Sequence, residues 1–174
     1  VLSSQPENVR RHLVYASLFY RFCGPLLTAV CDSHHKEDEA LGWEIIGWLK
    51  KNQLFLIPLD NDGYWYRFHH LFQELLEKQL QRHYAFDDIS TLHIKASVWF
   101  AEQNLIEEAI RHTLAANDLD AALRLVEQNR QELHNNDQWY VLEKWLSLFP
   151  ENVIQQYPEL LVVRMWILYH HFDV

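Results

Sequence analysis

The sequence predicts a mainly α-helical fold that holds one β-hairpin in its first half and antiparallel helical hairpins in its second. Three observations support this expectation. Apolar residues recur at helical spacing along most of the 174 residues. Residues 54–68 instead contain two β-prone runs around a turn. In the second half an eight-residue motif returns after thirteen positions, which is typical of stacked helical repeats.

The composition is that of a globular chain with a sizeable core. Apolar residues make up 49% of the sequence and charged residues 22%, which excludes a disordered or collagen-like chain. The charge is uneven, because residues 1–85 carry a net −1 and residues 86–174 a net −8. Phosphate backbones repel an acidic surface, so we expect no nucleic-acid binding by this chain alone.

The cysteines and the hydropathy predict a cytoplasmic chain. If a helix joins Cys23 and Cys31, their backbones lie about 12 Å apart, beyond the roughly 7 Å limit for a disulfide. Two free thiols suit a reducing compartment. No run approaches the about 18 apolar residues of a membrane span, and the first residues lack the order of a signal peptide. The sequence begins without Met, so we expect it to be part of a longer protein.

Three helices are expected before the hairpin. Residues 4–7, Ser-Gln-Pro-Glu, have the pattern of a capped helix start. A Cys-Gly-Pro break at residues 23–25 precedes a short apolar helix over residues 26–30. Residues 37–51 predict the third helix, since their apolar positions form one stripe. That stripe consists of Leu41, Ile45, Ile46 and Leu49.

The hairpin and the next helix complete a first domain over residues 1–85. Asp62 and Gly63 have turn chemistry between the runs at 54–57 and 64–68. Pro58 has no amide to donate, which places it at an edge or a strand end. Residues 69–82 are helical again, with one apolar face made of Leu71, Phe72, Leu75, Leu76 and Leu80. Three helices, a hairpin and a fourth helix are typical of a winged-helix unit. The aromatic residues Trp65, Tyr66 and Phe68 are interpreted as its core.

The second half predicts a helical arm over residues 86–149. Residues 104–111 and 117–124 share an Asn, an acid, an Ala and an Arg at matching positions. We expect each copy to start a helix, with Asn104 and Asn117 as N-caps. The other shared positions fit this interpretation, because acids favour a first turn and small residues allow close helix packing of the tetratricopeptide kind. They are Glu107 and Asp120, and Ala109 and Ala122.

Residues 150–174 predict the start of a further region of tetratricopeptide-like helices. Residues 160–169 are apolar on several faces, and such a helix needs a partner. The partner is either a following helix of a longer protein or a second copy of this chain. In the second case we expect a dimer contact through Leu161, Trp166 and Tyr169.

Sequence motifs for catalysis, metal binding and DNA reading are missing. None of the four glycines lies in a phosphate-binding loop, and no nucleophile or zinc motif occurs, so we expect no catalytic residue and no enzyme activity. The histidines come as adjacent pairs, which point about 100° apart on a helix, so we expect no metal site. The third helix begins with acids and the wing adds Asp60 and Asp62, so direct DNA contact is not expected.

A family resemblance rests mainly on the hairpin. Residues 54–60, followed by Trp-Tyr-Arg-Phe-His-His-Leu-Phe at 65–72, resemble the winged-helix part of MalT-like regulators. These form a subgroup of the LuxR-type transcriptional regulators and belong to the STAND class of signalling ATPases. Residues 6–10 and 21–26 resemble the start of that domain, and residues 99–116 resemble the helical arm that follows it.

The resemblance implies a large cytoplasmic switch. In such proteins an upstream P-loop domain binds nucleotide, a winged helix closes over it, and an arm leads to a superhelical sensor and a C-terminal helix-turn-helix. Bound ADP holds the closed state, and inducer with ATP opens it for transcription activation. The resemblance thus implies that the partners of this chain are the nucleotide-binding and sensor domains of the same protein. It implies no cofactor in the chain itself and ATP or ADP in the parent.

The resemblance also suggests site residues. Residues 68–70, Phe-His-His, occupy the place of the Met-His-Asp motif of related switches, so His69 is implied to contact the ADP β-phosphate. His70 stands where those proteins have Asp. Together with Arg67 and Arg21, His70 is a candidate contact to another domain, and both arginines fit equally well as surface charges. Without the resemblance, His69 is a helix N-terminal residue that caps or packs.

A different class of function stays open from the sequence. The chain can instead be a helical-repeat module whose groove, within residues 90–174, holds a partner protein or peptide.

Overall fold

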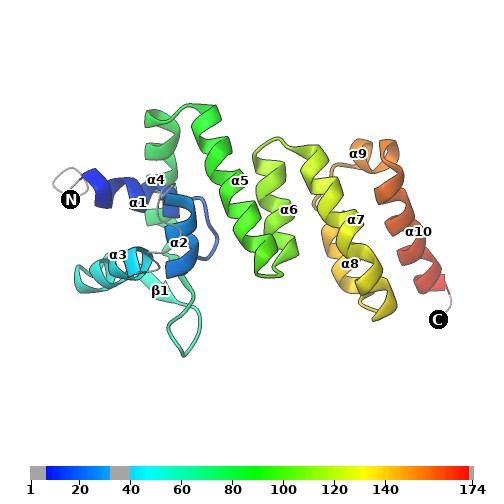
Figure 1. The fold of residues 1–174 in the computed structure, drawn as a ribbon, viewed down its shortest axis with the longest axis horizontal. Coiled ribbons are helices and arrows are strands. Elements are labelled where there is room, and N and C mark those ends of the chain that lie inside the picture. Colours follow the sequence, from blue (N-terminus) through cyan, green and yellow to red (C-terminus); the bar gives the residue numbers. More distant parts are fainter. Residues whose placement is uncertain (1–6, 32–39, 173–174) are drawn as a thin grey trace. The chain divides into compact units, whose positions relative to one another are not determined.

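The computed structural model describes residues 7–31 and 40–172 and divides the chain into two compact units, Val1–Ala96 and Ser97–Val174. The division falls inside α5 (Phe86–Glu102). The described part is mainly helical with a single two-stranded hairpin (Figure 1), which confirms the fold class expected from the sequence. No helix in this part is both long and apolar enough to cross a membrane.

In the described residues of the first unit, four helices and the hairpin precede α5. The helix starts expected at residues 4–7 and 37–39 fall, apart from Glu7, outside the described residues. The hairpin strands are shorter than expected, and Pro58 ends the first of them as predicted. The elements are α1 (Glu7–Ala16), α2 (Gly24–Cys31), α3 (Ala40–Lys51), β1 (Leu56–Pro58), β2 (Tyr66–Phe68) and α4 (His70–His83).

Two glycines allow α2 and α3 to touch backbone to backbone. A Cβ added to Gly42 would collide with the carbonyl oxygen of Gly24, and one added to Gly24 would lie 2.5 Å from the ring of Trp43. The amide of Gly42 also donates to the hydroxyl of Thr28 over 3.1 Å. Because no side chain separates the helices here, α2 and α3 pack more closely than larger residues would permit.

A third segment extends the hairpin. Strands β1 and β2 pair antiparallel with Ile57 opposite Arg67. On the other edge of β2, Phe22 and Tyr66 exchange both backbone hydrogen bonds, over 2.8 and 2.9 Å. This pairing fastens the segment before α2 to the wing, and β2 therefore lies between two partners.

The apolar face of α4 is narrower than the sequence predicts. Phe72, Leu76 and Leu80 are buried, but Leu71 is 64% exposed and Leu75 46% exposed. In the first unit α4 packs against α1, and Phe72 also contacts Phe68 of the wing. Leu71 and Leu75 therefore lie at the exposed margin of the apolar face expected from the sequence.

The second unit is helical throughout its described residues. Consecutive helices pack against one another, α6 against α7 and α7 against α8, and α10 returns to contact both α7 and α8. The small residues Ala109 and Ala122 are fully buried, as expected. After the end of α5, the elements are α6 (Ile106–Ala115), α7 (Leu119–Asn135), α8 (Trp139–Leu146), α9 (Glu151–Gln156) and α10 (Pro158–Phe172).

The repeated asparagines end helices and do not start them. Asn104 and Asn117 have φ values of 58° and 60°, and the residue after each donates its amide to the carbonyl five positions back. This is the Schellman arrangement, in which a left-handed residue closes a helix. The predicted N-cap role was therefore wrong, since Asp118 caps α7 through the amide of Ala121. Asp137, with φ 55°, closes α7 in the same way.

Candidate functional site: the outer face of the wing

Strand β2 has a buried and an outer face. Tyr66 and Phe68 are 2% and 1% exposed, as their predicted core role requires. Side chains alternate along extended backbone, so Trp65, Arg67 and His69 lie on the opposite side. We call these three residues with Arg21 the outer face of the wing. Trp65 is half-buried on this face, and its predicted place in the core was wrong.

His69 has a fixed backbone at the junction of the wing and α4. Its amide donates to the carbonyl of Phe55 over 2.8 Å, and its own carbonyl accepts from the amides of Phe72 and Gln73. His69 is the N-cap residue of α4, with extended φ and ψ, but its side chain makes no capping hydrogen bond. The imidazole therefore does not act as a side-chain cap. Its ring centroid lies 4.3 Å from that of His70, which is exposed in the first turn of α4.

Arg21 and Arg67 reach neighbouring positions through the pairing of Phe22 with Tyr66. Arg21 and Arg67 are the next residues along the two paired segments. The guanidinium carbon of Arg21 lies 4.4 Å over the ring of Trp65, a stacking that suits a cation. The outer face thus gathers two permanent cations and an imidazole.

Two features bear on the electrostatics of this face, the start of α4 and the acid Asp60. The first turn of α4 holds no acidic residue, and the N-terminus of a helix is its positive end. Asp60, an acid of the wing, accepts the amides of Tyr64 and Trp65 over 2.9 Å each. These bonds, together with a third amide from Gly63, hold its pKa below the ordinary value. Its carboxylate therefore stabilises the hairpin turn.

Nucleophilic and metal chemistry receive little support from the described residues. Cys23 is fully buried, and burial raises the pKa of its thiol to about 11, so it stays protonated near neutral pH. Among the residues that the structure describes, no group of three or more His, Cys, Asp or Glu side chains is placed to hold a metal ion.

Of the four predicted site residues, the structure brings Arg21, Arg67 and His69 to one face, while His70 extends from the next turn. Sequence reasoning missed Trp65 as the stacking surface for Arg21. It also missed the pairing of Phe22 with Tyr66, which brings Arg21 to the outer face of the wing. The run of alternating residues at 64–69 was the available signal for the outer position of Trp65.

These elements define a winged-helix domain: helices, a hairpin wing, a segment paired to the wing and a helix that starts at its end. Residues 1–87 match the family of the MalT winged helix domain, and the chain belongs to that family.

Curated relatives extend the similarity along nearly the whole chain. The serine/threonine-protein kinase PknK of Mycobacterium tuberculosis is 30% identical over 166 residues, which cover 95% of this chain and 14% of the kinase. The HTH-type transcriptional regulator MalT of Klebsiella pneumoniae is 28% identical over 168 residues, or 97% of this chain and 18% of that regulator. MalT of Vibrio parahaemolyticus is 27% identical over 161 residues, 92% of this chain and 17% of its own length. The chain therefore spans less than a fifth of these relatives.

Proposed function

We propose that this chain is a non-catalytic regulatory segment of a longer, cytoplasmic, ATP-dependent transcription regulator. The similarity to MalT regulators supports this proposal. The same segment is similar to part of a protein named as a kinase, so a segment of this kind can belong to proteins with different functions. In this proposal residues 1–85 close over nucleotide, residues 86–149 form an arm, and residues 150–174 begin the sensor.

The outer face of the wing is the observation that supports the proposed contact with nucleotide. A nucleotide held by a separate P-loop domain of the same protein presents its β-phosphate to His69, whose imidazole can donate a hydrogen bond to an oxygen in either charge state. Arg67 and Arg21 add charge-assisted donors, which are about twice as strong as neutral ones. The positive end of α4 supports the same anion.

The gene around this segment gives the first test. The proposal requires a P-loop before the segment and a basic helix-turn-helix after it, within about 300 codons on either side given usual domain sizes. A reading frame that encodes neither would overturn the proposal. The isolated chain should neither hydrolyse ATP nor bind it tightly, because it contains no phosphate-binding loop.

The second test measures ADP affinity in the full-length protein. A fluorescent ADP analogue is titrated against the wild type, His69→Ala and Arg67→Ala. We expect His69→Ala to raise the Kd about tenfold, the equivalent of one charged hydrogen bond of roughly 1.4 kcal/mol. Arg82→Ala is the matched control, because Arg82 lies at the far end of α4. An unchanged Kd in His69→Ala would remove the phosphate contact.

Direct DNA contact is no part of this proposal, since the acids of the wing disfavour it. The alternative function, a helical interaction module, draws support from one observation in the second unit, a pocket between its helices.

A further inference from the structure

A pocket of about 290 Å³ lies within the second unit, where α6, α7 and α8 meet. Its size is at the lower end for small-molecule sites, so it suits one or two side chains better than a nucleotide. Helix α6 and the residues just before it provide one wall, α7 a second, and α8 with the turn before it a third.

The lining combines apolar and acidic groups. Leu133, Val141 and the buried Trp145 supply apolar surface. Glu107, Glu108 and Glu132 supply three carboxylates, and the lining contains no Lys or Arg. Glu107 is already paired with Arg111 and Lys144, so Glu108 and Glu132 are the carboxylates of the lining outside this network. The lining thus differs in chemistry from the outer face of the wing.

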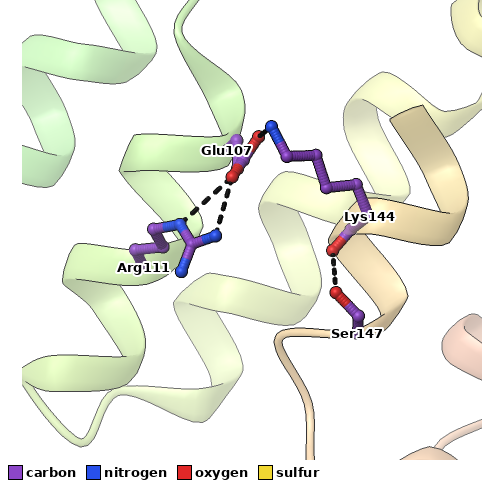
Figure 2. A network of polar contacts seen from close by, with 4 residues as sticks. All are labelled: Glu107, Arg111, Lys144 and Ser147. Carbon is purple, nitrogen blue, oxygen red and sulfur yellow. Dashed lines mark hydrogen bonds and ion pairs between the residues drawn. The ribbon is translucent and has the colours of Figure 1, made fainter. Parts of the chain in front are cut away.

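Glu107 is held in place as an ionised group. Arg111 donates to its Oε1 over 2.8 Å and Lys144 contacts its Oε2 over 2.7 Å (Figure 2). Burial pushes the pKa of this carboxyl up, but the hydrogen bonds from Lys144 and Arg111 outweigh that effect and hold the pKa below its ordinary value. Both cations lie outside the lining, and Figure 2 shows them approaching Glu107 from α6 and α8.

We propose that this pocket receives an arginine side chain from a peptide segment of a partner protein. The three methylenes of arginine pack on apolar surface while the guanidinium meets carboxylates. Its planar fork donates to several oxygens at once. The apolar residues of the lining, Leu133 and Val141 among them, suit the methylenes, and Glu132 and Glu108 suit the guanidinium. This proposal is independent of the nucleotide proposal, because it concerns only the second unit.

The experiment titrates a small probe into the 174-residue chain. The probe is the tripeptide acetyl-Leu-Arg-Leu-amide, and its neutral counterpart has citrulline in place of arginine. Two-dimensional ¹H–¹⁵N NMR follows the indole of Trp145 and the side-chain amides of Asn129 and Gln138, which line the pocket. We expect saturable shifts with a Kd of about 1 mM for this isolated anchor, and a Kd at least about fivefold higher for citrulline.

A matched pair of variants tests the acidic lining. Glu132→Gln should raise the Kd about threefold or more, whereas Glu127→Gln, which makes the same charge change on an exposed position of α7 outside the lining, should not. Unshifted melting temperatures show that both variants fold. Equal binding of the citrulline probe, equal effects of the two variants, or no saturable shift up to about 10 mM would each overturn the proposal.

Discussion

His69 combines a backbone fixed from both sides with an imidazole that does not cap its helix. The wing supplies one hydrogen bond to that backbone and α4 supplies two. The sequence placed His69 at this junction, because the end of the hairpin and the start of the helix are local patterns. It did not place Arg21 beside Arg67, since that depends on a pairing between residues 44 positions apart.

At the residue scale, replacing either of two glycines in α3 by alanine should change stability in opposite directions. Gly42→Ala should lower the free energy of unfolding by about 3 kcal/mol or more, because the new Cβ would collide with the Gly24 carbonyl. A Cβ added to Gly47 would meet no atom within 4 Å, so Gly47→Ala should raise stability by about 0.5–1 kcal/mol through helix propensity. Urea unfolding measures both, and equal effects of the two changes would contradict the close packing of α2 on α3.

The lowered pKa of Glu107 predicts that the free energy of unfolding depends on pH. Its folded pKa lies below the ordinary 4.5, so its contribution is fully present above about pH 4.5 and disappears as the pH falls through the lower folded value. Glu107→Gln should therefore cost about 1 kcal/mol at pH 7 and almost nothing in strong acid. Thermal unfolding of both proteins from pH 7 to 3 measures the difference. A cost that stayed constant over this range would show that the ion pairs with Arg111 and Lys144 contribute nothing.

At the scale of elements, helix ends were harder to predict than helices. The repeat at residues 104–124 was visible in the sequence, but its asparagines were assigned to helix starts. Asn is favoured both as an N-cap and in the left-handed conformation, and local sequence does not separate the two. The third such end, at Asp137, has no matching motif around it in the sequence, so no local pattern predicts it. The burial of Ala109 and Ala122, by contrast, followed directly from the spacing.

The left-handed ends give a testable contrast at Asn117. Asn117→Gly should leave stability unchanged or raise it slightly, because glycine adopts a φ of 60° without strain. Asn117→Val should lower the free energy of unfolding by about 1–2 kcal/mol, since a β-branched residue is disfavoured there. If Asn117 were instead an N-cap, Asn117→Gly would lower stability, because glycine has no side chain to accept a first-turn amide, and chemical denaturation would show a loss in both variants.

At the scale of the whole molecule, the fold class and the order of the elements followed from sequence patterns, whereas the faces left exposed did not. On α10, Leu160, Val163 and Ile167 are buried, while Met165 and Tyr169 are largely exposed. Trp166, expected in a dimer contact, packs within its own chain against His134, with Arg130 over its ring. Tertiary partners decide such assignments, and they are not encoded in the apolar pattern of one helix.

Exposed apolar residues on α10 are available for the predicted dimer contact, which stays a prediction. Of the residues predicted for this contact, Leu161, Trp166 and Tyr169, the first and last are exposed, as is Met165 between them. If two copies associate through this face, the chain should form a dimer at high concentration, and Met165→Glu should return it to a monomer by placing charge on the apolar face. Light scattering across a concentration series measures this. The matched change Gln156→Glu, on an exposed position of α9, should leave the dimer intact. A wild-type monomer at every concentration would exclude this contact.

Histidine accessibility in the full-length protein tests the central claim most directly. Diethyl pyrocarbonate modifies exposed imidazoles, and mass spectrometry reads His69 and His83, two positions at opposite ends of α4. If the wing closes over nucleotide, ADP should slow modification of His69 about fivefold or more, as expected when a bound ligand excludes reagent from its contact residues, and leave His83 unchanged. Equal rates at His69 with and without saturating ADP would contradict the claim that the outer face of the wing meets the nucleotide.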